Sequence, residues 1–168
     1  MIDPGEALGT SAQVAVTLAG FAGVVVVFGS RAVHEWSDID KFRLRLLLTF
    51  SAMPLVLSMV GLLLLATTMS PETAWRWCSA ISIVLQLPVV SRLWKVFADF
   101  PVQELETTGA SRLTFYGGAA AGMAVMLLQV VNAWILAAFW PFFMTIVLAI
   151  LSSTLQFMRL ILNRREWA

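Results

Sequence analysis

The chain has few of the residues that carry chemistry in proteins. Its 168 residues include one cysteine, one histidine and one tyrosine. A single cysteine excludes an intrachain disulfide, and we interpret Cys78 as an inert packing residue. A single histidine, His34, excludes a histidine-based metal site. The sequence also has no nucleotide-binding loop and no catalytic pair. It therefore predicts no catalytic residue, cofactor or metal, and we interpret the protein as not an enzyme.

Charge is also scarce. Only 12% of the residues are charged, and the net charge at pH 7 is +1. Nucleic-acid binding requires a concentrated basic face, so nucleic acid is not an expected partner. The long apolar runs contain no Asp or Glu, which argues against a carboxylate proton relay or an acidic cation filter within a membrane.

Apolar residues are abundant, at 60% of the chain, and they occur in five long runs. A helix needs about 20 apolar residues to cross the hydrocarbon core of a bilayer. We therefore predict an all-α integral membrane protein with five transmembrane helices in a single domain over residues 1–168. The expected spans are residues 9–29, 43–69, 73–97, 113–132 and 139–163.

The basic residues predict an orientation, because Lys and Arg near short loops stay on the cytoplasmic side. With five spans, all of them except Arg76 fall on one side. We expect the N-terminus outside, the C-terminus in the cytoplasm, and a multi-pass protein of the cell inner membrane. Tryptophan favours the interfacial layer, and the expected outer tryptophans are Trp75, Trp77, Trp134 and Trp140.

Two helix boundaries carry local signals. Ser70, Pro71 and Glu72 favour a helix start, because Ser caps, Pro has no N–H to satisfy, and Glu faces the positive end of the dipole. Residues 113–162 are nearly continuous in apolar character, so the turn there is less marked. We predict it around Asn132–Trp134, with Pro141 opening the last helix.

The polar residues within the runs fall on single helix faces. Such a face indicates either a hydrated pathway or a helix–helix seam whose polar groups bond to neighbours. The last helix has the longest stripe, in which Ala149 also takes part. The candidate pore or seam residues are Thr145, Ser152, Gln156, Arg159 and Asn163 on the last helix, Ser82 and Gln86 on the third, Gln129 and Asn132 on the fourth, and Gln13 and Thr17 on the first.

Small residues and prolines suggest how the helices pack and bend. Gly118 and Gly122 form a GxxxG pair, which predicts close packing within the chain or with another subunit. The first helix has small residues on one face and the polar residues Gln13 and Thr17 on another, so it is expected to pack on two sides. Pro54 and Pro88 interrupt helical hydrogen bonding, and we interpret them as bends or paired hinges. The small-residue face consists of Ala12, Ala15, Ala19 and Ala22.

Three runs, VAVTLAGFAGVVVVFGSR, KFRLRLLL and LQFMRLIL, resemble a group of small bacterial multi-pass membrane proteins without an assigned activity. The resemblance implies a bacterial inner-membrane setting. The segment TSAQVAVTLAGFAGVVVVF is also faintly similar to the pore-lining first helix of calcium-release-activated calcium channels. That family has a glutamate near the outer end of the helix, whereas this run ends in Val27 and Phe28 with the opposite expected direction, so no activity is implied.

These patterns favour two hypotheses. The first is a homo-oligomeric channel or pore-like protein, based on the polar faces. The alternative is a non-catalytic membrane subunit or scaffold, in which the same faces are satisfied seams and the Ala or Gly face binds another membrane protein. In both, the expected partners are the lipid bilayer and either further copies of the chain or a second membrane protein.

Overall fold

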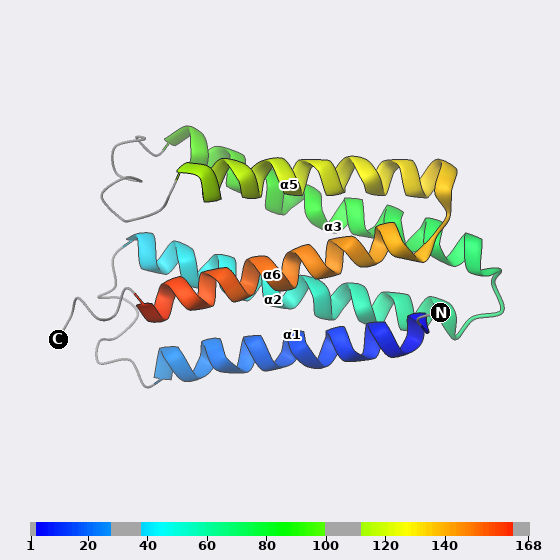
Figure 1. The fold of residues 1–168 in the computed structure, drawn as a ribbon, viewed down its shortest axis with the longest axis horizontal. Coiled ribbons are helices and arrows are strands. Elements are labelled where there is room, and N and C mark those ends of the chain that lie inside the picture. The colour runs from blue at the N-terminus through cyan, green and yellow to red at the C-terminus, as the bar shows by residue number, and fades with distance from the viewer. Residues whose placement is uncertain (1–2, 28–37, 100–111, 163–168) are drawn as a thin grey trace. The chain divides into compact units, whose positions relative to one another are not determined.

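The computed structural model describes residues 3–27, 38–99 and 112–162, and all regular structure in these ranges is helical (Figure 1). Five helices are long and apolar enough to cross a membrane, as the sequence predicts. The elements are α1 (Pro4–Val27), α2 (Asp38–Leu65), α3 (Pro71–Asp99), α5 (Arg112–Val131), the π-helix η2 (Asn132–Leu136) and α6 (Phe139–Leu162).

Contacts divide the chain into two compact units, and the division falls inside α6. The first unit comprises residues 1–68 and 143–168, with α1, α2 and most of α6. The second comprises residues 69–142, with α3, α5, η2 and the first turn of α6. The first unit therefore joins α6 to two helices that are distant in sequence, whereas the second is one continuous stretch of chain.

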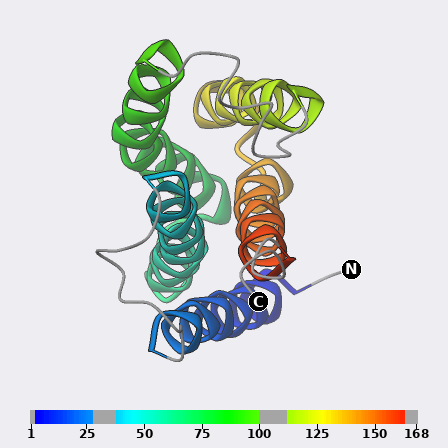
Figure 2. The ribbon, with the colours of Figure 1, turned by 90° about the vertical axis from the view of Figure 1, so that its left-hand side faces the viewer.

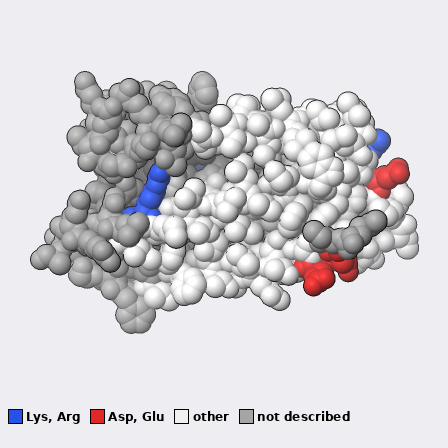
Figure 3. All heavy atoms as spheres, viewed as in Figure 1, with Lys and Arg blue, Asp and Glu red and all other residues white. Residues whose placement is uncertain are grey.

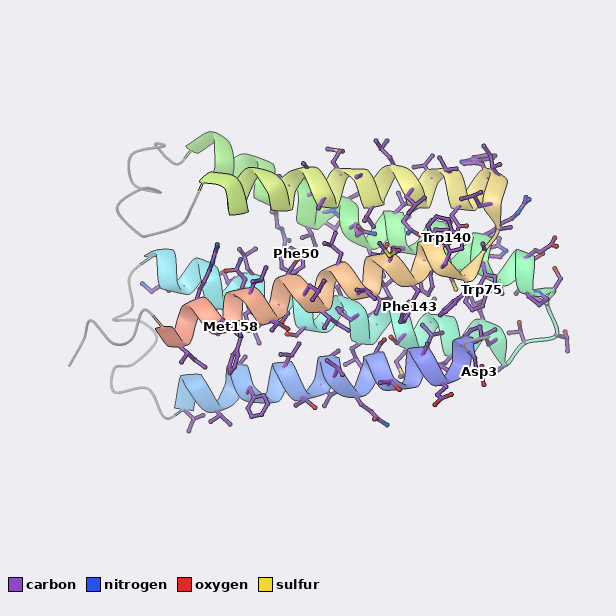
Figure 4. All side chains as sticks on the ribbon, in the orientation of Figure 1. Asp3, Phe50, Trp75, Trp140, Phe143 and Met158 are labelled. Carbon is purple, nitrogen blue, oxygen red and sulfur yellow. The ribbon has the colours of Figure 1, made fainter. Side chains whose placement is uncertain are left out.

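The first helix begins earlier than the predicted residue 9. The Asp3 carboxylate accepts a hydrogen bond from the Gly5 N–H at 2.9 Å and so caps the helix. Pro4 is the first helical residue, where its missing N–H costs nothing. The helix start therefore follows from capping chemistry rather than from hydropathy; Figure 4 labels Asp3 at this end.

Within the first unit, α1 packs along α2 (Figure 2). The buried side of α1 is lined mainly by alanine, and small residues let two helices approach closely. Ala15 and Ala22 are fully buried, Ala12 is 7% exposed and Ala19 is half-buried. The predicted small-residue face of α1 is thus covered by the chain itself.

The third helix starts at Pro71, as the local signals predict. Ser70 Oγ lies 2.9 Å from Thr73 Oγ1 and accepts a hydrogen bond from the Thr73 N–H at 3.4 Å. The Ser70 side chain therefore caps the helix. Both internal prolines lie within continuous helices, Pro54 buried in α2 and Pro88 exposed in α3. Their role as hinges stays a prediction.

The turn before the last helix lies further along the chain than predicted. Residues Asn132, Ala133 and Trp134 belong to η2, which continues helical structure to Leu136. The break occurs at Ala137, which has a left-handed φ of 51°, and α6 begins at Phe139. Pro141 lies in the first turn of α6, where a proline is tolerated.

The surface of these helices is strongly apolar. Charged side chains on the described part of the face in Figure 3 lie near helix ends, and the surface between them has almost none. Large exposed hydrophobic residues occur in each of the five long helices; Leu63, for example, is 68% exposed. Such a surface fits lipid as the solvent, and the five apolar helices fit a helical-bundle membrane protein.

Candidate functional site

Asn132 is the centre of the most connected polar cluster in the second unit. Its side-chain amide donates hydrogen bonds to Ser79 Oγ at 2.7 Å and to the Ala138 carbonyl at 3.0 Å. Its side-chain oxygen accepts a bond from the Ala138 N–H at 2.9 Å. Asn132 is fully buried, so these bonds satisfy groups that neither water nor lipid would reach.

The same residue explains the position of the turn. The Asn132 carbonyl accepts a hydrogen bond from the Ala137 N–H at 3.0 Å, five residues later, which defines the π-helical turn. Ala137 then adopts the left-handed conformation, and the Asn132 side chain binds both backbone groups of Ala138. Because these bonds need the folded turn, apolar periodicity alone places the break several residues too early.

Gln129 and an aromatic group extend this cluster. The Gln129 amide donates to the Pro141 carbonyl at 2.6 Å, while its buried side-chain oxygen has no partner within the described chain. The Trp75 ring, labelled in Figure 4, lies 4.9 Å from the Phe139 ring and 6.3 Å from the Phe142 ring, measured between ring centroids. These contacts tie the start of α3 to the α5–α6 junction.

Three of the four predicted outer tryptophans are exposed, and the fourth, Trp75, is buried. Trp77, Trp134 and Trp140 are at least 55% exposed. They lie at the same end of the second unit as the hydrogen bond between Asn132 and Ser79. Trp75 is only 5% exposed, because its ring packs on the phenylalanines at the start of α6. Trp75 therefore has a packing role, and its position at the membrane interface stays a prediction.

Further along α3, Gln86 is satisfied by its own helix. Its amide donates to Ser82 Oγ at 2.7 Å and to the Ser82 carbonyl at 3.1 Å. Ser82 is fully buried and Gln86 is half-buried. The Gln86 side-chain N–H group therefore has its partners within α3.

The first unit has a polar seam that sequence analysis missed. Ser51 Oγ of α2 lies 2.6 Å from Ser153 Oγ of α6, and both serines are buried. Ser51 also donates to the Leu47 carbonyl at 2.8 Å, and the Ser153 hydroxyl lies 3.3 Å from the same oxygen. Single serines are common in apolar helices, so neither residue gave a signal before the two helices were placed together.

The predicted stripe on α6 is only partly buried. Thr145 and Ala149 are buried, but Ser152, Gln156 and Arg159 are half-buried, and Asn163 lies outside the described residues. The buried line continues instead through Ser153, four residues after Ala149. The Thr145 hydroxyl and the Ser58 hydroxyl of α2 have no partner in the described chain.

We expect the serine pair to stabilise the first unit modestly. Replacing either Ser51 or Ser153 by alanine should lower the free energy of unfolding by about 0.5 to 1.5 kcal/mol, because one hydrogen bond within a membrane helix bundle is worth this order. The double variant should cost less than the sum of the single changes. Unfolding titrations in detergent measure these values, and strictly additive costs would contradict the bond.

The outward side of α1 is unusual. Gln13 and Thr17 are exposed, and within the described residues the Thr17 hydroxyl bonds only to the Gln13 carbonyl of its own helix, at 2.8 Å. Gly20 continues the same line and is also exposed. These residues lie opposite the alanine face that α2 covers. The polar residues predicted on α1 are thus the ones that the described chain leaves uncovered.

The GxxxG pair of α5 makes no close contact within the described chain. Gly118 is exposed and Gly122 half-exposed, and a Cβ built at either would meet no heavy atom within 4 Å. Among the described residues, these glycines therefore make no close helix contact. Packing against another subunit stays a prediction.

The side chains that could ligate a metal are dispersed among the described residues. These residues contain no group of three or more His, Cys, Asp or Glu side chains that could hold a metal ion. Cys78 is a free thiol, but it is fully buried. No protein-family model, curated protein or solved structure matches the chain.

Proposed function

We propose that the protein is a non-catalytic membrane subunit that assembles with another transmembrane helix. The contact surface is the α1 line, the exposed residues Gln13, Thr17 and Gly20 on one side of α1. The observation that carries this proposal is the exposure of Gln13. In a membrane-spanning α1, Gln13 lies near the middle of the Pro4–Val24 span, about 14 Å from its start at ~1.5 Å per residue. A polar group exposed to hydrocarbon at that depth costs several kcal/mol, so a protein contact there is strongly favoured.

The paired polar groups inside the two units support assembly rather than a pathway through one chain. Ser51 bonds Ser153 and Asn132 bonds Ser79, so these polar side chains already have hydrogen-bond partners on neighbouring helices. Gln86 is likewise bonded within α3. A hydrated path lined by these groups would have to break bonds that the fold already makes. We further propose the inner-membrane setting and the outside N-terminus that the basic residues and the bacterial resemblance favour.

A photocrosslinking amino acid at position 13 or 17 tests whether this face meets protein in native membranes. We expect protein adducts from both positions, because the proposed partner helix covers them. The matched control is Leu63, which is 68% exposed on α2 and should crosslink mainly to lipid. Lipid adducts alone from positions 13 and 17 would refute the assembly function.

A homo-oligomeric channel is the second candidate, and the same polar line favours it. In that arrangement Thr17 would face a water-filled lumen instead of a packed helix. A Thr17→Cys variant in a Cys78→Ala background distinguishes the two. A membrane-impermeant thiol reagent labels the new cysteine in a lumen and leaves it unlabelled in a closed seam, and liposome flux measurements give an independent reading.

A further inference from the structure

We infer that the partner of the α1 line is α1 of a second copy of this chain, in parallel orientation with Gln13 facing Gln13. The inference rests on the proposed assembly function and names the partner of that same surface. It follows from the spacing of the exposed residues, from the chemistry of the amide and from its depth in the span.

The exposed residues of α1 follow a heptad spacing. Steps of three and four residues alternate along the line, which is the repeat of two helices packed in a left-handed supercoil. At about 100° per residue, this line runs along the centre of the exposed arc, opposite buried Ala15 and Ala22. Its members are all exposed: Thr10, Gln13, Thr17, Gly20, Val24 and Val27.

This arrangement is the reverse of that expected for a helix solvated by lipid. Val14 and Phe21 lie toward the edges of the exposed arc, whereas Gln13 lies at its centre. Within the described chain, the Gln13 side-chain amide has no hydrogen-bond partner. The most polar residue of the span thus points directly away from the unit that contains it, as a residue at a helix–helix contact would.

A second copy fits this surface better than an unrelated helix. A glutamine amide is self-complementary, since it has two N–H donors and a carbonyl acceptor. All copies of one chain insert in the same direction, so parallel packing places Gln13 at the same depth in both helices. An unrelated partner would need its own polar group at that depth. A single polar residue in such a seam also sets the register.

The remainder of the line is compatible with self-contact. A Cβ built at Gly20 would meet no atom within 4 Å, so the second backbone can approach closely there. Val24 and Val27 supply apolar packing at the far end. Glu6 begins the same line, but it lies in the first turn, where water and salt screen repulsion between copies.

Disulfide crosslinking of the full chain in membranes tests this arrangement. In a Cys78→Ala background, Gln13→Cys and Gly20→Cys should each give covalent dimers on mild oxidation. Val14→Cys is the matched control, because it is 40% exposed but lies about 100° around the helix from Gln13. Equal dimer yields at positions 13 and 14, or none at 13 and 20, would overturn the inference.

Self-association in liposomes, measured by fluorescence energy transfer as lipid is added, provides the quantitative test. Gln13→Leu should weaken association about 3- to 20-fold, the range that one or two interhelical hydrogen bonds supply, and Gln13→Asn should restore part of it. Because Gln13 is exposed, the stability of the single chain should stay unchanged. An unchanged association constant would contradict the proposed contact.

The outcomes separate the partner from the function. Photocrosslinks from position 13 to a different polypeptide, without covalent dimers, would support the assembly function and overturn the second-copy inference. Lipid adducts alone would overturn both. Labelling of Thr17→Cys from the water phase in a crosslinked oligomer would show a lumen and overturn the closed seam.

Discussion

Replacing Asn132 by alanine is expected to lower the free energy of unfolding by about 2 to 4 kcal/mol. The change removes three side-chain hydrogen bonds and leaves both backbone groups of Ala138 without their partner in a buried turn. The nearby Trp134 and Trp140 make the loss measurable. Denaturant titration in detergent, followed by tryptophan fluorescence, should show a lower midpoint.

The neighbouring serine is the matched control for this prediction. Ser79→Ala removes only one of the three bonds and should cost about 0.5 to 1 kcal/mol. The double variant should be little worse than Asn132→Ala alone, because the bond to Ser79 is already lost there. If Asn132→Ala unfolds at the wild-type midpoint, the α5–α6 turn does not depend on this side chain.

Replacing Ala15 by phenylalanine is expected to destabilise the first unit by about 2 to 3 kcal/mol. Ala15 is fully buried on the face of α1 that packs along α2, so a large ring must push the helices apart or adopt a strained rotamer. Thermal unfolding in detergent, or proteolysis of the folded protein, measures the loss.

Val16 offers a control at the adjacent position. It is 53% exposed, so Val16→Phe introduces the same ring at a position that is open to the surface, and stability should change by less than about 0.5 kcal/mol. Equal effects at positions 15 and 16 would show that the alanine face of α1 is not tightly packed.

Helix number and length were predictable because they depend on local chemistry. Each apolar run is long enough for one bilayer crossing, and Ser70 with Pro71 determines where α3 starts. The early start of α1 at Pro4 was also readable in principle, since Asp3 is a standard cap. A hydropathy criterion overlooks it because capping residues are polar.

The polar contacts were less predictable, because they join residues far apart in the chain. Asn132 and Gln129 were recognised as polar positions, but nothing local indicated Ser79 or the Pro141 carbonyl as their partners. Ser51 and Ser153 gave no signal at all until α2 and α6 were placed side by side. A serine bonds its own helix equally well, so its type does not reveal a long-range partner.

The amino-acid sequence alone determined five apolar helices and their approximate limits, since hydrophobic length and capping act within single segments. The tertiary structure decided how each helix is rotated about its own axis. That rotation covers the alanine face of α1 and exposes Gln13, buries Ser153 rather than Ser152, and leaves Gly118 open. The physical reason is that rotation depends on competing contacts with neighbouring helices, and periodicity within one segment does not rank those contacts.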